Sequence, residues 1–261
     1  MHIGVDFDNT IVCYDALFHR VAREKNLIPD TVPVNKSDVR NYLRRVGNEE
    51  AWTEMQGYVY GFRMAEAAPY PGVIEFFQAC RAVGLPISII SHKTRHPFRG
   101  EPYDLHAAAT AWLELQGFFD PAKIGLPRSE VFFELTKVAK LERIASCGCT
   151  HFVDDLPEFL AEAAFPPGVL RILFDSNELY GAEAKFLRAS AWSAIRELFA
   201  LELARPTEAT ALREKVTPLV RRLGDMGAYV LQPLPGGANN RVFRLRSEAG
   251  DRVLKSYFQN P

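Results

Sequence analysis

The chain has 261 residues, of which 48% are hydrophobic and 24% are charged, a composition typical of a globular protein with a sizeable core. The 31 basic residues nearly balance the 32 acidic ones, and a net charge of −1 offers no general attraction to nucleic acid or to an anionic membrane. The four cysteines form neither a disulfide framework nor a zinc motif. The sequence contains no signal segment and no membrane-spanning run. Together these features favour a reduced, cytoplasmic setting.

Short apolar runs alternate with helical periodicity from the first residues onward. The runs predict buried strands at His2–Val5, Pro86–Ile90, Val131–Phe133, His151–Val153 and Val169–Phe174. The segments between them predict several short helices within 14–68, a helix that starts near Pro71 and ends at Gly84, and helices over 105–116 and 136–145. This alternation predicts a Rossmann-like α/β fold, a parallel sheet covered by helices on both faces, with ligands at the carboxyl ends of the strands.

Polar side chains follow the predicted strands where such ligands bind. They are Asp6, Asp8, Ser91, Asp154 and Asp155. Asp6 and Asp8 can turn toward one point, and Mg²⁺ suits a site made of Asp6, a backbone carbonyl near Asp8 and a distant carboxylate such as Asp154. With Mg²⁺ bound, Asp6 can attack a phosphorus atom, and Asp8 can pass a proton to the leaving oxygen. The set therefore predicts magnesium-dependent phosphoryl transfer.

A serine hydroxyl and a lysine are expected to hold the oxygens of the transferred phosphoryl group. Ser91 supplies the hydroxyl, and either Lys137 or Lys140 supplies the ammonium group. We favour Lys140, although Thr136 as an N-cap would put Lys137 in the first helical turn, nearest the site. Taken singly, each of the polar residues also fits a purely structural role, such as a capped turn or a helix N-cap.

The order Asp6-Phe7-Asp8-Asn9-Thr10, Ile89-Ile90-Ser91, a lysine and Val153-Asp154-Asp155 resembles the haloacid dehalogenase (HAD) superfamily. The resemblance spans about residues 1–204. It implies Asp6 as nucleophile, Asp8 as general acid/base, Ser91 as a phosphate binder and Asp154 with Asp155 as the acidic metal pair. The helical segment at about 14–70 resembles that superfamily's cap, which implies that it closes over the site and selects a phosphorylated small-molecule substrate.

A dense basic segment, residues 92–99, directly follows Ser91. It fits two interpretations equally well: a solvated loop, or a binding site for a second anionic group of the substrate. By contrast, we assign no function to the triplet at 147–149, which fits a turn between a helix and a strand.

The sequence changes character after Ala204, which predicts a second domain over 205–261. The run Leu234–Leu245 followed by Val253-Leu254-Lys255 resembles the start of the aminoglycoside phosphotransferase and choline kinase family. That resemblance implies a partial α+β kinase-like lobe with a glycine-rich hairpin at 236–240 over ATP phosphates and Lys255 as their partner. The alternative function is therefore a non-catalytic or regulatory HAD-like module of a bifunctional small-molecule kinase whose catalytic half lies outside these residues.

Overall fold

A computed structural model describes residues 1–180, 186–200, 216, 218–220, 222, 228–234, 240–248 and 250–257. The predicted boundary at Ala204 and the glycine pair at 236–237 lie outside the described residues. Among the described residues, none of the helices is both long and apolar enough to cross a membrane.

A six-stranded parallel sheet contains all five strands predicted from the sequence. Its order is β5-β4-β1-β6-β7-β8. The strands are β1 (Ile3–Val5), β4 (Ile87–His92), β5 (Val131–Glu134), β6 (His151–Asp154), β7 (Leu170–Phe174) and β8 (Leu187–Ala189). β4 runs two residues past its predicted end, so Ser91 lies within the strand. β8 was not predicted, because Leu187-Arg188-Ala189 contains a charged residue and no β-branched or aromatic one.

The chain folds into two compact units, of which the first comprises Met1–Val5, Pro71–Ser88 and Leu141–Pro261. Here α4 (Val73–Ala82) and α8 (Trp192–Leu198) pack through aromatic rings, since the centroids of Phe76 and Trp192 lie 5.1 Å apart. The ring of Phe174 on β7 lies 5.8 Å from that of Trp192. The short helix α7 (Pro157–Leu160) follows β6. These contacts help to bury the apolar face of α4, the helix that the sequence predicts between Pro71 and Gly84.

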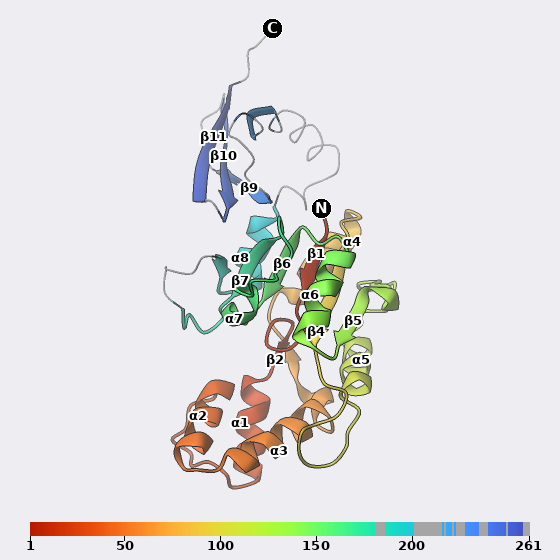
Figure 1. The fold of residues 1–261 in the computed structure, drawn as a ribbon, viewed down its shortest axis with the longest axis vertical. Helices are drawn as coiled ribbons and strands as arrows, with labels where there is room; N and C mark the ends of the chain where they lie inside the picture. Colours follow the sequence, from red (N-terminus) through yellow and green to blue (C-terminus); the bar gives the residue numbers. More distant parts are fainter. Residues whose placement is uncertain are drawn as a thin grey trace. The chain divides into compact units, whose positions relative to one another are not determined.

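The second unit comprises Asp6–Tyr70 and Ile89–Lys140. Its helices are α1 (Asp15–Glu24), α2 (Lys36–Arg45), α3 (Glu49–Tyr60), α5 (Leu105–Leu115), the start of α6 (Lys137–Ser146) and the 3₁₀ turns η1 (Met64–Glu66) and η2 (Arg128–Glu130). Figure 1 shows α1, α2 and α3 grouped together, and rings such as Phe18 and Trp52, 5.0 Å apart, fill the space among them. A small ribbon pairs β2 (Val12–Cys13) with β3 (Ala68–Pro69), where the chain enters and leaves this helical segment.

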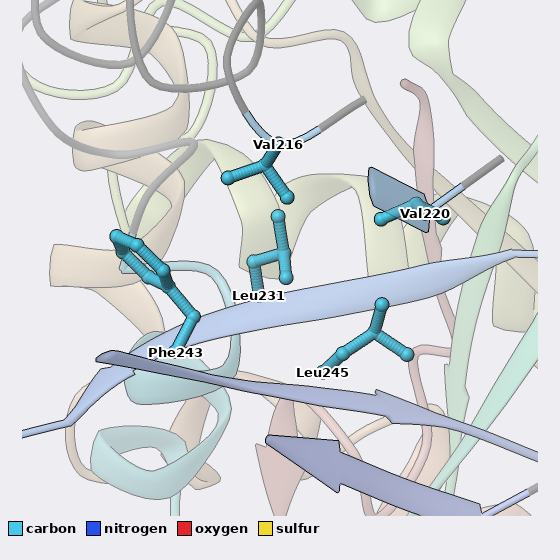
Figure 2. Packing of buried hydrophobic residues seen from close by; sticks show 5 residues of the cluster. All are labelled: Val216, Val220, Leu231, Phe243 and Leu245. Atoms are coloured by element: carbon cyan, nitrogen blue, oxygen red, sulfur yellow. The ribbon is translucent and has the colours of Figure 1, made fainter. Parts of the chain in front are cut away.

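The C-terminal part forms an antiparallel sheet in the order β11-β10-β9. Its strands are β9 (Tyr229–Leu234), β10 (Asn240–Ser247) and β11 (Gly250–Tyr257). Val216 and Val220 pack against Leu231, Phe243 and Leu245, as Figure 2 shows, so one face of this sheet has a core of its own. This sheet contains the described residues of the runs Leu234–Leu245 and Val253–Lys255, and the kinase-like identity of the segment stays a prediction.

Candidate functional site

Asp6 directly follows β1, and its carboxylate meets a buried lysine. Lys140 Nζ lies 2.6 Å from Asp6 Oδ1, and both side chains are buried. Thr136 caps α6 by accepting the backbone N–H of Ala139 on its hydroxyl at 3.0 Å, which places Lys140 one turn into the helix. Lys137, the other candidate, is exposed. Burying a charge without a partner is costly, so Asp6 and Lys140 each require the opposite charge of the other close by.

Phe7, which lies between Asp6 and Asp8 in the sequence, points into the core. The Phe7 ring packs edge-on against Trp112 at 5.6 Å and against Phe133 at 5.4 Å. Burial raises the pKa of Tyr14, and the charges of Asp8 and Asp6 both add to this rise, so both carboxylates lie near this one phenol.

Three hydrogen bonds hold the carboxylate of Asp8. Lys93 Nζ donates to both oxygens, at 2.9 and 2.8 Å, and the hydroxyl of Tyr14 donates to Oδ1 at 2.6 Å. Burial raises the pKa of Asp8, but the charge and hydrogen bonds of Lys93, the Tyr14 hydroxyl and the charge of Lys36 outweigh it, so the pKa falls below its ordinary value. Burial, and then the charge of Asp8, raise the pKa of Tyr14 well above its ordinary value, so Tyr14 remains a donor.

Lys93 is a site residue that the sequence interpretation did not single out. It is the second residue after Ser91, and its backbone N–H continues the β4–β5 ladder by donating to the carbonyl of Glu134 at 2.9 Å. The ring of His106 donates to the carbonyl of Lys93 at 2.8 Å. The ammonium group lies 4.9 Å from the ring centroid of Tyr60. The only sequence signal is a lysine placed two positions after the expected phosphate-binding serine.

The rest of the basic segment has its charges paired on the surface. Arg95 binds Asp104 at 2.9 Å and Arg99 binds Glu50 at 3.0 Å, with the two arginine side chains 63% and 52% exposed. His92 donates from Nε2 to the carbonyl of Leu135 at 3.2 Å, and burial, with the charges of Lys140 and Lys137, lowers its pKa. Both arginines are therefore exposed and paired with acidic residues, whereas Lys93 binds Asp8.

Ser91 is buried in β4, where it pairs in register with Phe133 of β5. Since β4 and β1 are neighbours in the sheet, Ser91 and Asp6 belong to adjacent strands at their carboxyl ends. This is the placement that the sequence predicts for a phosphate-binding hydroxyl.

Asp154 ends β6, the other neighbour of β1. Val5 pairs with Val153 in the parallel ladder, so Asp6 and Asp154 follow paired residues. One carboxylate oxygen from each of Asp6, Asp154 and Asp155 lies within 4.8 Å of the others. Asp154 is buried and accepts the backbone N–H of Leu156 on Oδ1 at 2.9 Å. Closely spaced carboxylates repel one another, so the three acids fit a hard divalent cation such as Mg²⁺.

Lys255 lies apart from these residues in the chain. It is an exposed residue of β11 that pairs in register with Val242 of β10. Its assignment to ATP stays a prediction, and the glycine-rich hairpin predicted at 236–240 lies outside the described residues except for Asn240.

Comparisons with known proteins find similarity to solved structures. A HAD family hydrolase from Deinococcus radiodurans, solved with bound phosphate and sodium, is 16% identical with a TM-score of 0.48, over 77% of this chain and 95% of that one. A HAD-superfamily hydrolase from Ehrlichia chaffeensis is 14% identical with a TM-score of 0.44, over 77% and 96% of the two chains. A HAD phosphatase from Thermococcus onnurineus is 14% identical with a TM-score of 0.44, over 76% and 97%.

No protein-family model matches the sequence, and no curated protein matches it. At identities and TM-scores this low, the likeness concerns the fold alone. Any functional conclusion therefore depends on the residues of this chain.

Proposed function

We propose that this protein is a magnesium-dependent phosphatase of the HAD type that hydrolyses a phosphorylated small metabolite through an aspartyl-phosphate on Asp6. The observation that carries the proposal is the buried contact of 2.6 Å between Lys140 Nζ and Asp6 Oδ1, next to a second carboxylate, Asp8. A carboxylate held by an ammonium group at the end of a central strand is oriented for attack, and the same ammonium group can stabilise phosphoryl oxygens.

In the first step Asp6 forms a bond to phosphorus while the bond from phosphorus to the ester oxygen breaks. Asp8 in its acid form gives a proton to that oxygen, and the alcohol leaves. In the second step water attacks the phosphorus of the aspartyl-phosphate, and Asp8 takes the proton of the water. Phosphate leaves and Asp6 returns to its free carboxylate, so atoms and charges balance over the cycle.

Asp6, the backbone carbonyl of Asp8 and Asp154 would hold Mg²⁺, with Asp155 as a further acidic group. A bound Mg²⁺ supplies positive charge that screens the repulsion between Asp6 and the phosphate dianion. Ser91 and Lys140 hold the phosphoryl oxygens. In this scheme Lys93 keeps Asp8 in place and favours its carboxylate form, the form needed when water attacks. The charge of a bound phosphoryl group opposes that of Lys93 and favours protonation of Asp8 for the first step.

The variant Asp6→Asn tests the mechanism, because an amide cannot form the aspartyl-phosphate. Phosphate release from a panel of phosphate monoesters is expected to depend on Mg²⁺ and to vanish in Asp6→Asn. The matched control is Asp38→Asn, which changes an exposed carboxylate on α2. Wild-type release of phosphate by Asp6→Asn in the presence of Mg²⁺ would show that another group is the nucleophile.

The alternative function is a non-catalytic module attached to a small-molecule kinase, and it rests on the sequence resemblance of Leu234–Leu245 and Val253-Leu254-Lys255 alone. Absence of magnesium-dependent phosphate release from every ester of the panel, together with consumption of ATP by a longer chain, would favour it.

A further inference from the structure

Asp8 receives its hydrogen bonds unequally on its two oxygens. Lys93 Nζ lies 2.9 Å from Oδ1 and 2.8 Å from Oδ2, so it does not distinguish them. The hydroxyl of Tyr14 donates to Oδ1 alone, at 2.6 Å. Among the described residues, Oδ1 therefore accepts two hydrogen bonds and Oδ2 accepts one. Each carboxylate oxygen has two lone pairs, so Oδ1 is filled and Oδ2 keeps one lone pair for a substrate or a water molecule.

The two donors also differ in rigidity. A lysine reaches its partner through a flexible four-carbon stem, whereas a tyrosine has only two side-chain torsions. The side chain of Tyr14 is buried, and its ring packs edge-on against the rings of Phe18 and Tyr60, with centroids 6.1 and 4.9 Å away. The sulfur of Met64 lies 3.3 Å from the hydroxyl oxygen of Tyr14. Tyr14 is therefore the more rigid of the two donors.

The backbone of Tyr14 is fixed where the chain enters the helical segment. Tyr14 directly follows β2, which pairs with β3 in the small ribbon. Next to this ribbon, the backbone N–H of Tyr70 donates to the carbonyl of Ile11 at 2.8 Å. The carbonyl of Tyr14 accepts the backbone N–H of Phe18 at 2.9 Å, in the first turn of α1. Both the main chain and the ring of Tyr14 therefore determine where its hydroxyl lies.

We propose that Tyr14 is a positioning residue, whose hydroxyl holds Oδ1 of Asp8 so that Oδ2 exchanges the proton with the ester oxygen and with the attacking water. The inference deepens the proposed function and rests on it. Without the hydroxyl, the contact with Lys93 still holds the carboxylate, but the carboxylate can turn together with the ammonium group. A small displacement of a reacting group lowers the rate of its step strongly.

A series of leaving groups measures this role of Tyr14. Alkyl phosphates release strongly basic alkoxides unless a proton is supplied, whereas nitrophenyl phosphate and acetyl phosphate release weakly basic anions that leave without one. The quantity compared is kcat/KM with Mg²⁺ present. It covers the steps up to departure of the leaving group and excludes the later hydrolysis of the aspartyl-phosphate. A positioning role in proton donation therefore affects kcat/KM for the alkyl phosphates selectively.

The variant Tyr14→Phe keeps the packed ring and removes the donor. We expect kcat/KM to fall about 10- to 100-fold for alkyl phosphates and less than about threefold for nitrophenyl phosphate and acetyl phosphate. The matched control Tyr42→Phe makes the same change on α2, where the ring lies 5.4 Å from the guanidinium group of Arg45, and is expected to keep the wild-type values.

Two further side chains in place of Tyr14 separate the hydroxyl from the shape of the ring. The side chain of meta-fluorotyrosine retains a donating hydroxyl and is expected to keep the wild-type ratio of kcat/KM between alkyl and nitrophenyl phosphates. The side chain of para-fluorophenylalanine fills the space of the hydroxyl without donating, and it is expected to show the selective loss even if Tyr14→Phe fails to fold.

The other outcomes overturn the role of Tyr14. One is a kcat/KM that falls equally for all substrates or stays at the wild-type value. Another is a gain for alkyl phosphates: a carboxylate that loses a hydrogen bond is easier to protonate, so a gain would show that Tyr14 alters the proton affinity of Asp8 and not its position. In both cases the phosphatase function stands. Absence of magnesium-dependent phosphate release by the wild-type protein from every substrate would instead overturn that function, and with it any proton transfer by Asp8.

Discussion

The ion pair between Lys93 and Asp8 predicts a strong energetic coupling that a double-mutant cycle can measure. The side chain of Lys93 is 3% exposed and that of Asp8 21% exposed. Removing one partner of a buried ion pair costs about 3–5 kcal/mol. Since Asp8 is partly exposed and keeps the hydrogen bond from Tyr14, we expect Lys93→Met to lower the free energy of unfolding by about 2–4 kcal/mol. The methionine can still pack against Phe7 and Tyr60.

Asp8→Asn leaves Lys93 with a neutral partner and is expected to cost about 1–3 kcal/mol. In the double variant no unpaired charge remains, so its loss of stability should fall short of the sum of the single losses by about 2 kcal/mol. The assay is urea unfolding without added Mg²⁺, followed by tryptophan fluorescence, because Trp52 and Trp112 belong to the same unit as the ion pair. Lys25→Met, on the surface, should change the stability by less than about 0.5 kcal/mol. Single losses that add up in the double variant to within about 0.5 kcal/mol would refute the coupling.

Two further predictions concern Lys140 and Cys80. Lys140→Met is expected to lower kcat for phosphate release by about 100-fold or more, because it removes a charged group from the phosphoryl oxygens. Lys137→Met, at an exposed position of the same helix, should lower kcat by less than about twofold. Equal losses in both variants would contradict the role given to Lys140. Burial raises the pKa of the Cys80 thiol to about 12. In the folded protein at pH 8 we therefore expect this thiol to react with a disulfide reagent about 1,000-fold more slowly than an ordinary thiol, and to react at once after unfolding in urea. Fast labelling of Cys80 in the folded protein, located by mass spectrometry, would show that the thiol is accessible to solvent.

The sheet was predictable because each of its main strands is a compact apolar run that ends at a polar residue. Val5 before Asp6 and Val153 before Asp154 are two such ends, and the ladder pairs them in register. The helices were predictable for a similar reason: Gly84, with a φ of 68°, ends the helix begun near Pro71. The sequence pattern therefore predicts a helix or strand correctly where the environment of each residue is determined by its neighbours in the sequence.

The contacts of Lys93 and Lys36 were not predictable in the same way. Lys93 reaches Asp8 across 85 residues of sequence, and Lys36 reaches Asn9 across 27. Both depend on the path of a loop or helix that follows no repeating pattern, and a basic residue in a polar segment is usually a solvated one. In the sequence, buried Lys93 is set apart from exposed Arg95 by its position two residues after Ser91.

The loop between Lys93 and His106 is tied at both of its ends. The backbone N–H of Leu105 donates to the carbonyl of Arg95 at 2.9 Å, and His106 donates to the carbonyl of Lys93. These bonds close the base of the loop independently of residues 96–103. The span between them can therefore be exchanged for one of different length or bulk without moving the ammonium group that holds Asp8. The length of this loop is therefore a variable that can be altered by design while the position of Lys93 is preserved.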